Sequence, residues 1–146
     1  MSILTVFDVA HYILKKHGSM SAMKLQKLVY YSQAWSLVWD DKPLFNEKIE
    51  AWANGPVVRA LYDKHRGVFE VKKDLFESLE NKHLNSDQKE TIDAVLGFYG
   101  DKSAQWLSDQ THSEEPWQSA REGLTDSERG DNSIPLDSMA EFYSSL

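Results

Sequence analysis

Hydrophobic residues recur at helical spacing along the first segment of the chain. Thr5 stands before this segment as a candidate N-cap, and Asp8, three residues later, completes a capping box. Three basic residues precede Gly18; they suit the C-terminal end of a helix dipole, and the glycine provides a stop. We therefore predict a helix over residues 5–17, whose apolar positions are Val6, Val9, Ala10, Ile13 and Leu14.

A second helix is predicted from Ser21 to about Trp39, and it is unusually apolar. Beyond residue 28, its polar positions are only Ser32, Gln33 and Ser36. A helix with apolar groups on nearly all sides is normally the central element of its domain. We therefore expect the other helices to pack around residues 21–39.

The segment after this helix carries the pattern of a β-hairpin near residues 43–53. Apolar residues flank a polar turn at residues 46–48, as two short strands around a turn would. Asn54, Gly55 and Pro56 come next, and proline suits the first position of a helix, with glycine before it as a flexible junction. A third helix is therefore predicted from Pro56 to about His65.

The rest of the chain adds further helices. Residues 68–84 show only weak helical spacing, whereas Asn85 and Ser86 are good caps for a helix that ends near Tyr99. Short helices follow around Trp106 and after a turn at residues 111–117, then a polar loop at about 123–133 and a C-terminal helix at about 135–146. The predicted fold class is mainly α: a compact single-domain helical bundle over residues 1–146, with one small β-hairpin.

The charge of the chain is unevenly placed. Residues 1–100 carry 13 Lys/Arg and 13 Asp/Glu, so the last 46 residues carry the whole net charge of −7. An acidic region works against nucleic-acid binding, because affinity for phosphates depends on cationic contacts. No segment suits a signal peptide or a membrane helix, so we expect a cytoplasmic protein that does not bind a membrane.

No motif in the sequence indicates a catalytic, metal or cofactor site. The chain has no cysteine, and its five histidines form no pair with metal-ligand spacing. There is no nucleophile elbow and no glycine-rich phosphate loop. We therefore expect a binding protein and not an enzyme, with no catalytic residue, no metal and no cofactor.

Nucleic-acid binding remains an alternative. The order helix, turn, helix, hairpin, helix is loosely that of winged-helix proteins, which leaves open a small DNA-binding regulator. Lys15, Lys16, Lys24 and Lys27 would form its basic edge. Four lysines are fewer than DNA-binding domains usually display, and solvated faces of two helices account for them equally well.

An ordered set of short motifs resembles the Panacea domain, a family that includes SocA-like and phage-associated antitoxins. The motifs are KLQKLVYY at 24–31, PLF at 43–45, IEAW at 49–52, GPV at 55–57, LY at 61–62, TH at 111–112 and EPW at 115–117. The resemblance implies a bacterial or prophage antitoxin that binds a toxin encoded by an adjacent gene. It also leaves open a SocA-like adaptor that delivers the toxin to a cytoplasmic protease, and an oligomer within the toxin complex.

Aromatic side chains near the predicted hairpin are the first candidates for contact with such a partner. Adjacent residues of a helix point in different directions, so we expect either Tyr30 or Tyr31 to lie near the surface. Tyr31, Trp52 and Asn54 are the resulting contact candidates, and Lys24 and Lys27 could pair with an acidic toxin surface. We expect Gly55, Pro56 and Val57 to set the backbone geometry instead.

Overall fold

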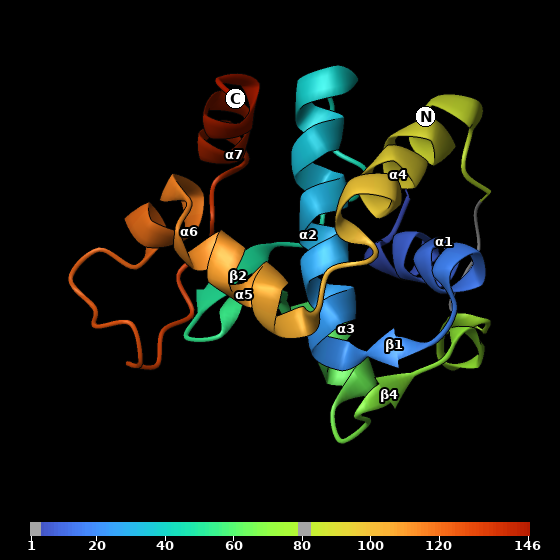
Figure 1. Cartoon of the computed structure of the whole chain (residues 1–146), viewed down its shortest axis with the longest axis horizontal. Coiled ribbons are helices and arrows are strands. Elements are labelled where there is room, and N and C mark those ends of the chain that lie inside the picture. Colours follow the sequence, from blue (N-terminus) through green and yellow to red (C-terminus); the bar gives the residue numbers. More distant parts are fainter. Residues whose placement is uncertain (1–3, 79–82) are drawn as a thin grey trace.

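A computed structural model describes residues 4–78 and 83–146 of the chain, and in these residues the fold is mainly α, as predicted (Figure 1). The described part contains seven α-helices and two small antiparallel sheets. The helices are α1 (Val6–His17), α2 (Ala22–Trp39), α3 (Arg59–His65), α4 (Ser86–Tyr99), α5 (Ala104–His112), α6 (Glu115–Ala120) and α7 (Leu136–Ser144). The sheets pair β1 (Met20–Ser21) with β4 (Glu70–Val71), and β2 (Ile49–Trp52) with β3 (Gly55–Val58).

Local capping signals fix the ends of the longer helices. Thr5 and Asp8 form the predicted capping box at the start of α1, and the side chain of Ser21 caps α2. Asn85 caps α4 through a second capping box with Gln88. The predicted bounds of these three helices are confirmed, because each cap acts within three residues of the helix that it starts.

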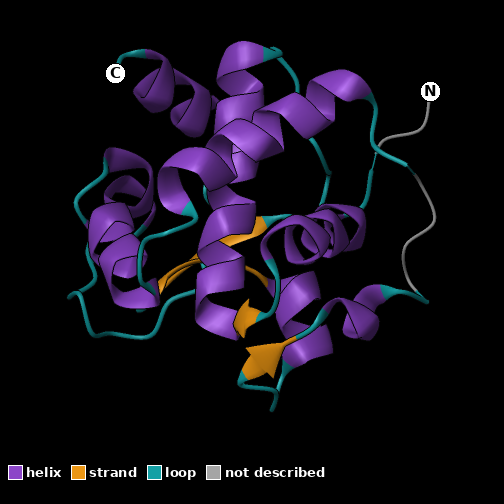
Figure 2. Cartoon of the chain, turned by 45° about the vertical axis from the view of Figure 1, so that its right-hand side comes forward, coloured by secondary structure: helices purple, strands orange, loops and turns teal. Residues whose placement is uncertain are grey.

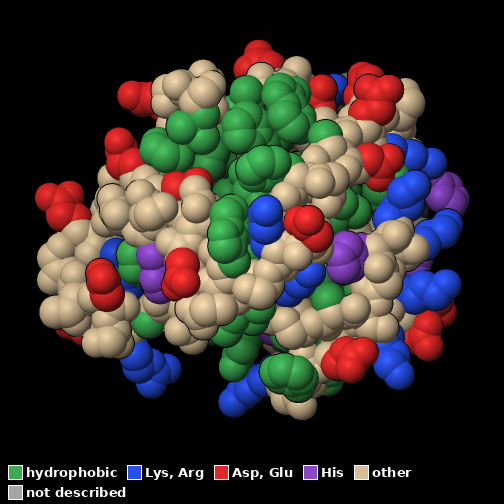
Figure 3. Space-filling model, viewed as in Figure 1, with side chains coloured by type: hydrophobic (Ala, Val, Ile, Leu, Met, Phe, Trp, Pro, Cys, Tyr) green, Lys and Arg blue, Asp and Glu red, His purple; other side chains and the backbone are tan. Residues whose placement is uncertain are grey.

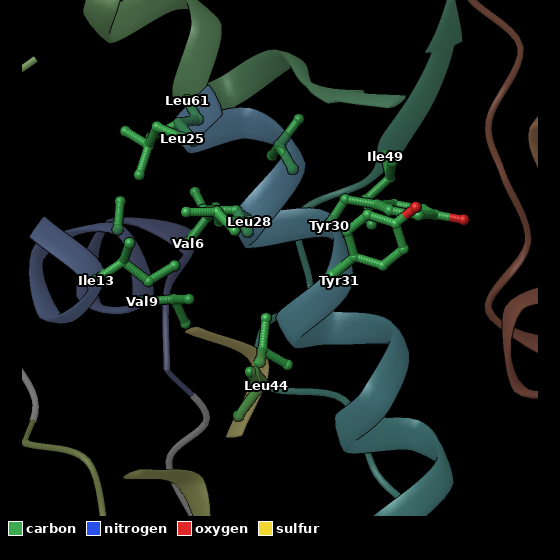
Figure 4. Close-up of a cluster of buried hydrophobic side chains, with 14 of the residues drawn as sticks. Val6, Val9, Ile13, Leu25, Leu28, Tyr30, Tyr31, Leu44, Ile49 and Leu61 are labelled. Atoms are coloured by element: carbon green, nitrogen blue, oxygen red, sulfur yellow. The ribbon is translucent and has the colours of Figure 1, made fainter. Parts of the chain in front are cut away.

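The second helix occupies the centre of the molecule, as its all-round apolar pattern predicts (Figure 2). Every residue from Leu25 to Ala34 is buried. Figure 4 shows Val6, Val9 and Ile13 of α1 packed toward one side of this helix. Figures 1 and 2 also show that the strands gather around the N-terminal half of α2, whereas α4 and α7 flank its C-terminal half.

The β-hairpin lies later in the chain than the sequence predicts. Its strands are β2 and β3, and its two-residue turn is Ala53–Asn54 instead of residues 46–48. The helical start predicted at Pro56 is also wrong, since α3 begins at Arg59. Ala51 faces Pro56 in the ladder, and the backbone N–H of Ala51 bonds outward to the Asn132 carbonyl at 2.8 Å. Pro56 therefore occupies a non-hydrogen-bonded position, where its missing N–H costs no ladder bond.

The polar loop after α6 is tied to the hairpin. Ser133 forms an antiparallel bridge with Glu50, and the Ile134 N–H donates to the Ile49 carbonyl at 2.8 Å. This segment thus covers the outer edge of β2. Of the weakly patterned stretch at 68–84, the structure describes β4 and a 3₁₀ turn at Lys73–Phe76; residues 79–82 lie outside the described residues.

Candidate partner-binding surface

Two neighbouring side chains of α2 complete the inner edge of the hairpin. Gln26 accepts a hydrogen bond from the Val58 N–H at 2.9 Å and donates one to the Val58 carbonyl at 3.3 Å. Lys27 donates to the Pro56 carbonyl at 3.3 Å. Because side chains replace the missing strand partner, the hairpin is locked onto the central helix.

Lys27 is buried, contrary to its predicted role at the surface. It is 1% exposed, and burial lowers the pKa of its ammonium group to about 8. Its chain passes directly over Gly55: a Cβ atom at that position would lie 2.5 Å from the Lys27 Cε. Gly55 also has a φ of +120°, which strongly favours glycine. Lys24 is half-buried on the first turn of α2.

A carboxylate and three tyrosines form a buried polar cluster at the middle of α2, which we call the tyrosine cluster (Tyr30, Tyr31, Tyr143 and Glu114). Tyr31 and Tyr143 both donate to Glu114 Oε1, at 2.8 and 2.7 Å. The hydroxyls of Tyr30 and Tyr143 lie 3.0 Å apart. Gln110 donates to the second carboxylate oxygen at 3.2 Å. Burial raises the pKa of Glu114, and these hydrogen bonds to its carboxylate partly offset that effect.

The tyrosine cluster overturns the expectation that one of two adjacent tyrosines lies near the surface. Tyr30 and Tyr31 are 1% and 0% exposed, so neither lies near the surface. Both can be buried because α2 is surrounded on all sides. Glu114 is the acceptor that satisfies the hydroxyls of Tyr31 and Tyr143.

Beyond this cluster, α2 ends in a patch of exposed rings that we call the aromatic face (Trp35, Trp39, Phe98 and Trp106). Trp39, Phe98 and Trp106 are 52%, 61% and 38% exposed, and half-buried Trp35 stacks on Trp39 with ring centroids 5.0 Å apart. The Lys102 ammonium lies over both Phe98 and Trp106, at 5.9 and 5.2 Å from their centroids. Figure 3 shows apolar side chains gathered over the C-terminal end of α2 and beside α7.

The aromatic face rests directly on the buried cluster. Tyr99 stacks on Tyr31 with centroids 4.1 Å apart, and its hydroxyl accepts a hydrogen bond from Trp35 Nε1 at 3.2 Å. The exposed rings of Trp39 and Phe98 are therefore held by packed neighbours, Trp35 and Tyr99. Exposed aromatic patches on a rigid support are typical of protein–protein interaction sites.

The other two predicted contact residues lie together at the hairpin, in a separate groove of about 550 Å³. Trp52 is half-buried and Asn54 is exposed at the hairpin turn. Gly55, Pro56 and Val57 form β3 beside them and are buried. The structure thus brings Trp52 and Asn54 together, and places Lys27 and Tyr31 in the core.

Sequence reasoning missed Phe98 and Trp106. A signal for Phe98 was present, because it neighbours Tyr99 in a helix, and only one of two adjacent rings on the amphipathic α4 can face inward. The same argument fails for Tyr30 and Tyr31 because α2 is not amphipathic.

Two structural features are absent from the described residues, 4–78 and 83–146. These hold no group of three or more His, Asp or Glu side chains placed to bind a metal ion. Nor does any helix among them have the length and apolar character needed to cross a membrane.

Comparison with known families gives one result. The family model described as "Antitoxin SocA-like, Panacea domain" matches residues 25–118, which is more than half of the chain. The match includes most of the central helix, the hairpin and Glu114. It also includes Tyr30, Tyr31 and Tyr99, whereas Tyr143 lies outside it. No curated protein and no solved structure matches the chain.

Proposed function

Because this chain belongs to the SocA-like Panacea antitoxin family, we propose that it neutralises a cognate toxin, encoded by an adjacent gene, by direct protein–protein binding. The observation that carries this proposal is the aromatic face. Three large rings are at least 38% exposed: Trp39 and Phe98 pack on Trp35 and Tyr99, and the Lys102 ammonium lies over Phe98 and Trp106.

The chemistry of the aromatic face suits a protein partner. Each ring that a partner covers removes on the order of 100 Å² of apolar surface from water, which contributes about 2–3 kcal/mol. Rings that are already fixed lose little conformational entropy on binding. Asp41 and Asp101 are exposed next to α2 and α4, and the last third of the chain carries the net negative charge. A toxin surface with apolar anchors and a basic rim fits this face best.

The toxin would be neutralised simply by being bound at the aromatic face. A partner seated on the aromatic face would have its own contact surface covered, which blocks a toxin whose active groups lie there or nearby. No reaction by the antitoxin is needed. The predicted role as a non-enzymatic binder is consistent with this mechanism.

The direct test is co-expression with the product of the adjacent gene. We expect the two proteins to co-purify and the growth defect caused by the toxin to be relieved. Substituting Trp39→Ser and Phe98→Ser together should weaken binding by at least about 100-fold, because two anchors are removed. The matched control is Phe69→Ser: Phe69 is 84% exposed but precedes β4, at the opposite end of the molecule from the C-terminus of α2 (Figure 1).

Three outcomes separate the alternatives. If the toxin neither co-purifies nor loses its toxicity, the proposal is wrong. Relief of toxicity that disappears in a host without the cytoplasmic protease would favour an adaptor that delivers the toxin for degradation. Equal loss of binding in the Phe69→Ser control would place the contact away from the aromatic face.

A further inference from the structure

Three arginines converge on the groove beside the hairpin turn. Arg59, Arg66 and Arg129 line it together with Trp52, Tyr62 and Asp131. Within the described part of the chain, neither Arg66 nor Arg129 forms an ion pair or a hydrogen bond through its side chain. We propose that this groove binds an extended, acidic segment of a partner protein, with Arg66 and Arg129 pairing with its carboxylates.

The inner wall of the groove is aromatic and rigid. Trp52 and Tyr62 meet edge to face with centroids 4.9 Å apart, and the Arg59 guanidinium lies 5.2 Å from the Trp52 ring centroid. Glu50 accepts hydrogen bonds from Arg59 Nε at 3.3 Å and from Trp52 Nε1 at 2.8 Å. The charge of Arg59 is therefore already matched, and it acts as part of the wall. Arg66 and Arg129, which have no side-chain partner among residues 4–78 and 83–146, supply the free positive charge.

The loop that carries Arg129 is held in position by the buried side chain of Arg121. Arg121 is 3% exposed, and its guanidinium donates to the carbonyls of Ala51 at 3.0 Å, Thr125 at 2.8 Å and Glu128. Asn132 is tied to the opposite side by its bond to Ala51. Arg129 thus lies between two anchored points. A side chain presented by a fixed backbone loses less entropy when it binds.

Charge favours a carboxylate-bearing protein segment over a nucleic acid. Guanidinium groups bind carboxylates in a planar, two-bond geometry, and aromatic walls accept the aliphatic parts of a peptide. A nucleic acid needs several cationic contacts along its backbone, whereas this groove offers Arg66 and Arg129, with Asp131 also in its lining. The groove is separate from the aromatic face, so this inference does not depend on the proposed function.

The test uses the full chain and a fluorescein-labelled synthetic peptide in which glutamates alternate with serine and leucine. Binding is followed by fluorescence anisotropy. We expect saturable binding that falls by about tenfold or more in the variant Arg66→Gln/Arg129→Gln. The variant Lys15→Gln/Lys16→Gln removes the same charge from the exposed end of α1 and should bind as the original chain does. A peptide with glutamine in place of glutamate should not bind.

Several results would overturn the inference. One is the absence of saturable peptide binding; another is an equal loss in the two double variants, which would indicate a general charge effect. Tighter binding of a single-stranded oligonucleotide, lost in the same arginine variant, would assign the groove to nucleic acid instead. As a positional readout, the indole N–H signal of Trp52 in NMR spectra should shift on addition of the peptide, whereas shifts confined to α1 would contradict the proposal.

Discussion

The two halves of the central helix use the same kind of residue for opposite purposes. From Leu25 to Ala34 every side chain of α2 is buried, and the tyrosines there donate hydrogen bonds within the core. At its C-terminal end, Trp39 is 52% exposed and its neighbour Trp35 stacks on it. The difference arises from what surrounds each half: the strands gather around the N-terminal half, whereas α4 and α7 flank the C-terminal half and leave Trp39 exposed (Figures 1 and 2).

The role of an aromatic residue in α2 therefore depends on its surroundings and not on its residue type. A buried tyrosine needs a partner for its hydroxyl, and Glu114 supplies that partner for two of them. An exposed tryptophan has no such requirement in the free protein. Substitutions in the buried half should therefore cost folding free energy, whereas substitutions at the exposed end should change only binding.

The largest effect on stability is expected from Glu114→Ala. The change leaves the hydroxyls of Tyr31 and Tyr143 without their acceptor and opens a cavity, so the free energy of unfolding should fall by about 3 kcal/mol or more. Urea denaturation followed by circular dichroism measures this loss. The control Glu114→Gln keeps an acceptor oxygen and the side-chain volume, so it should cost less than about 1 kcal/mol. Equal losses in the two variants would show that the hydrogen bonds are not the cause.

Gly55→Ala should give the next largest loss, about 2 kcal/mol in the free energy of unfolding. The added methyl group would meet the Lys27 Cε at 2.5 Å and would stand at a φ of +120°. Gly97→Ala is the matched control, since that glycine lies inside α4 with no atom within 4 Å of an added Cβ. It should be neutral or stabilising by up to about 1 kcal/mol. An unchanged free energy of unfolding in Gly55→Ala would contradict the close packing of Lys27 against the hairpin.

Lys27 predicts a dependence of stability on pH. Its pKa in the folded protein, about 8, lies below the usual value of 10.5, so between these values the unfolded chain binds more protons than the folded one. Stability should therefore rise with pH in this window. Relative to Lys27→Met, which has no charge to bury, the original chain should gain on the order of 1–2 kcal/mol between pH 7 and 9.5. Parallel pH profiles of the two proteins would show that the pKa of Lys27 is not lowered.

The smallest effect on stability should come from the exposed end of α2. The pair Trp39→Ser and Phe98→Ser should change the free energy of unfolding by no more than about 1 kcal/mol, although it is expected to weaken toxin binding by at least about 100-fold. Thermal melting of the purified variant measures this directly. A loss as large as that of Glu114→Ala would mean that these rings support the fold, and would remove the distinction between the two halves.

The candidate surface was only partly predictable from the chain. Trp52 and Asn54 were expected at the partner-binding surface, and they lie together in the groove beside the hairpin turn. Tyr31 and Lys27 were expected at the surface, and both are in the core. Their burial depends on partners far away in the chain: Tyr31 bonds to Glu114, 83 positions away, and Lys27 bonds to Pro56, 29 positions away. Local spacing holds no information about such neighbours.

The sequence by itself determined the helices that begin with capping residues, the central position of residues 22–39 and the family to which the chain belongs. These features depend on interactions within a few residues, or on an ordered set of short motifs. Only the tertiary structure decided that Pro56 lies in a strand, that Glu114 is buried among tyrosines, and that Arg66 and Arg129 meet at one groove. Each of these depends on side chains from distant segments, such as Gln26 and Lys27 beneath the hairpin, because burial and hydrogen bonding are satisfied in space and not along the chain.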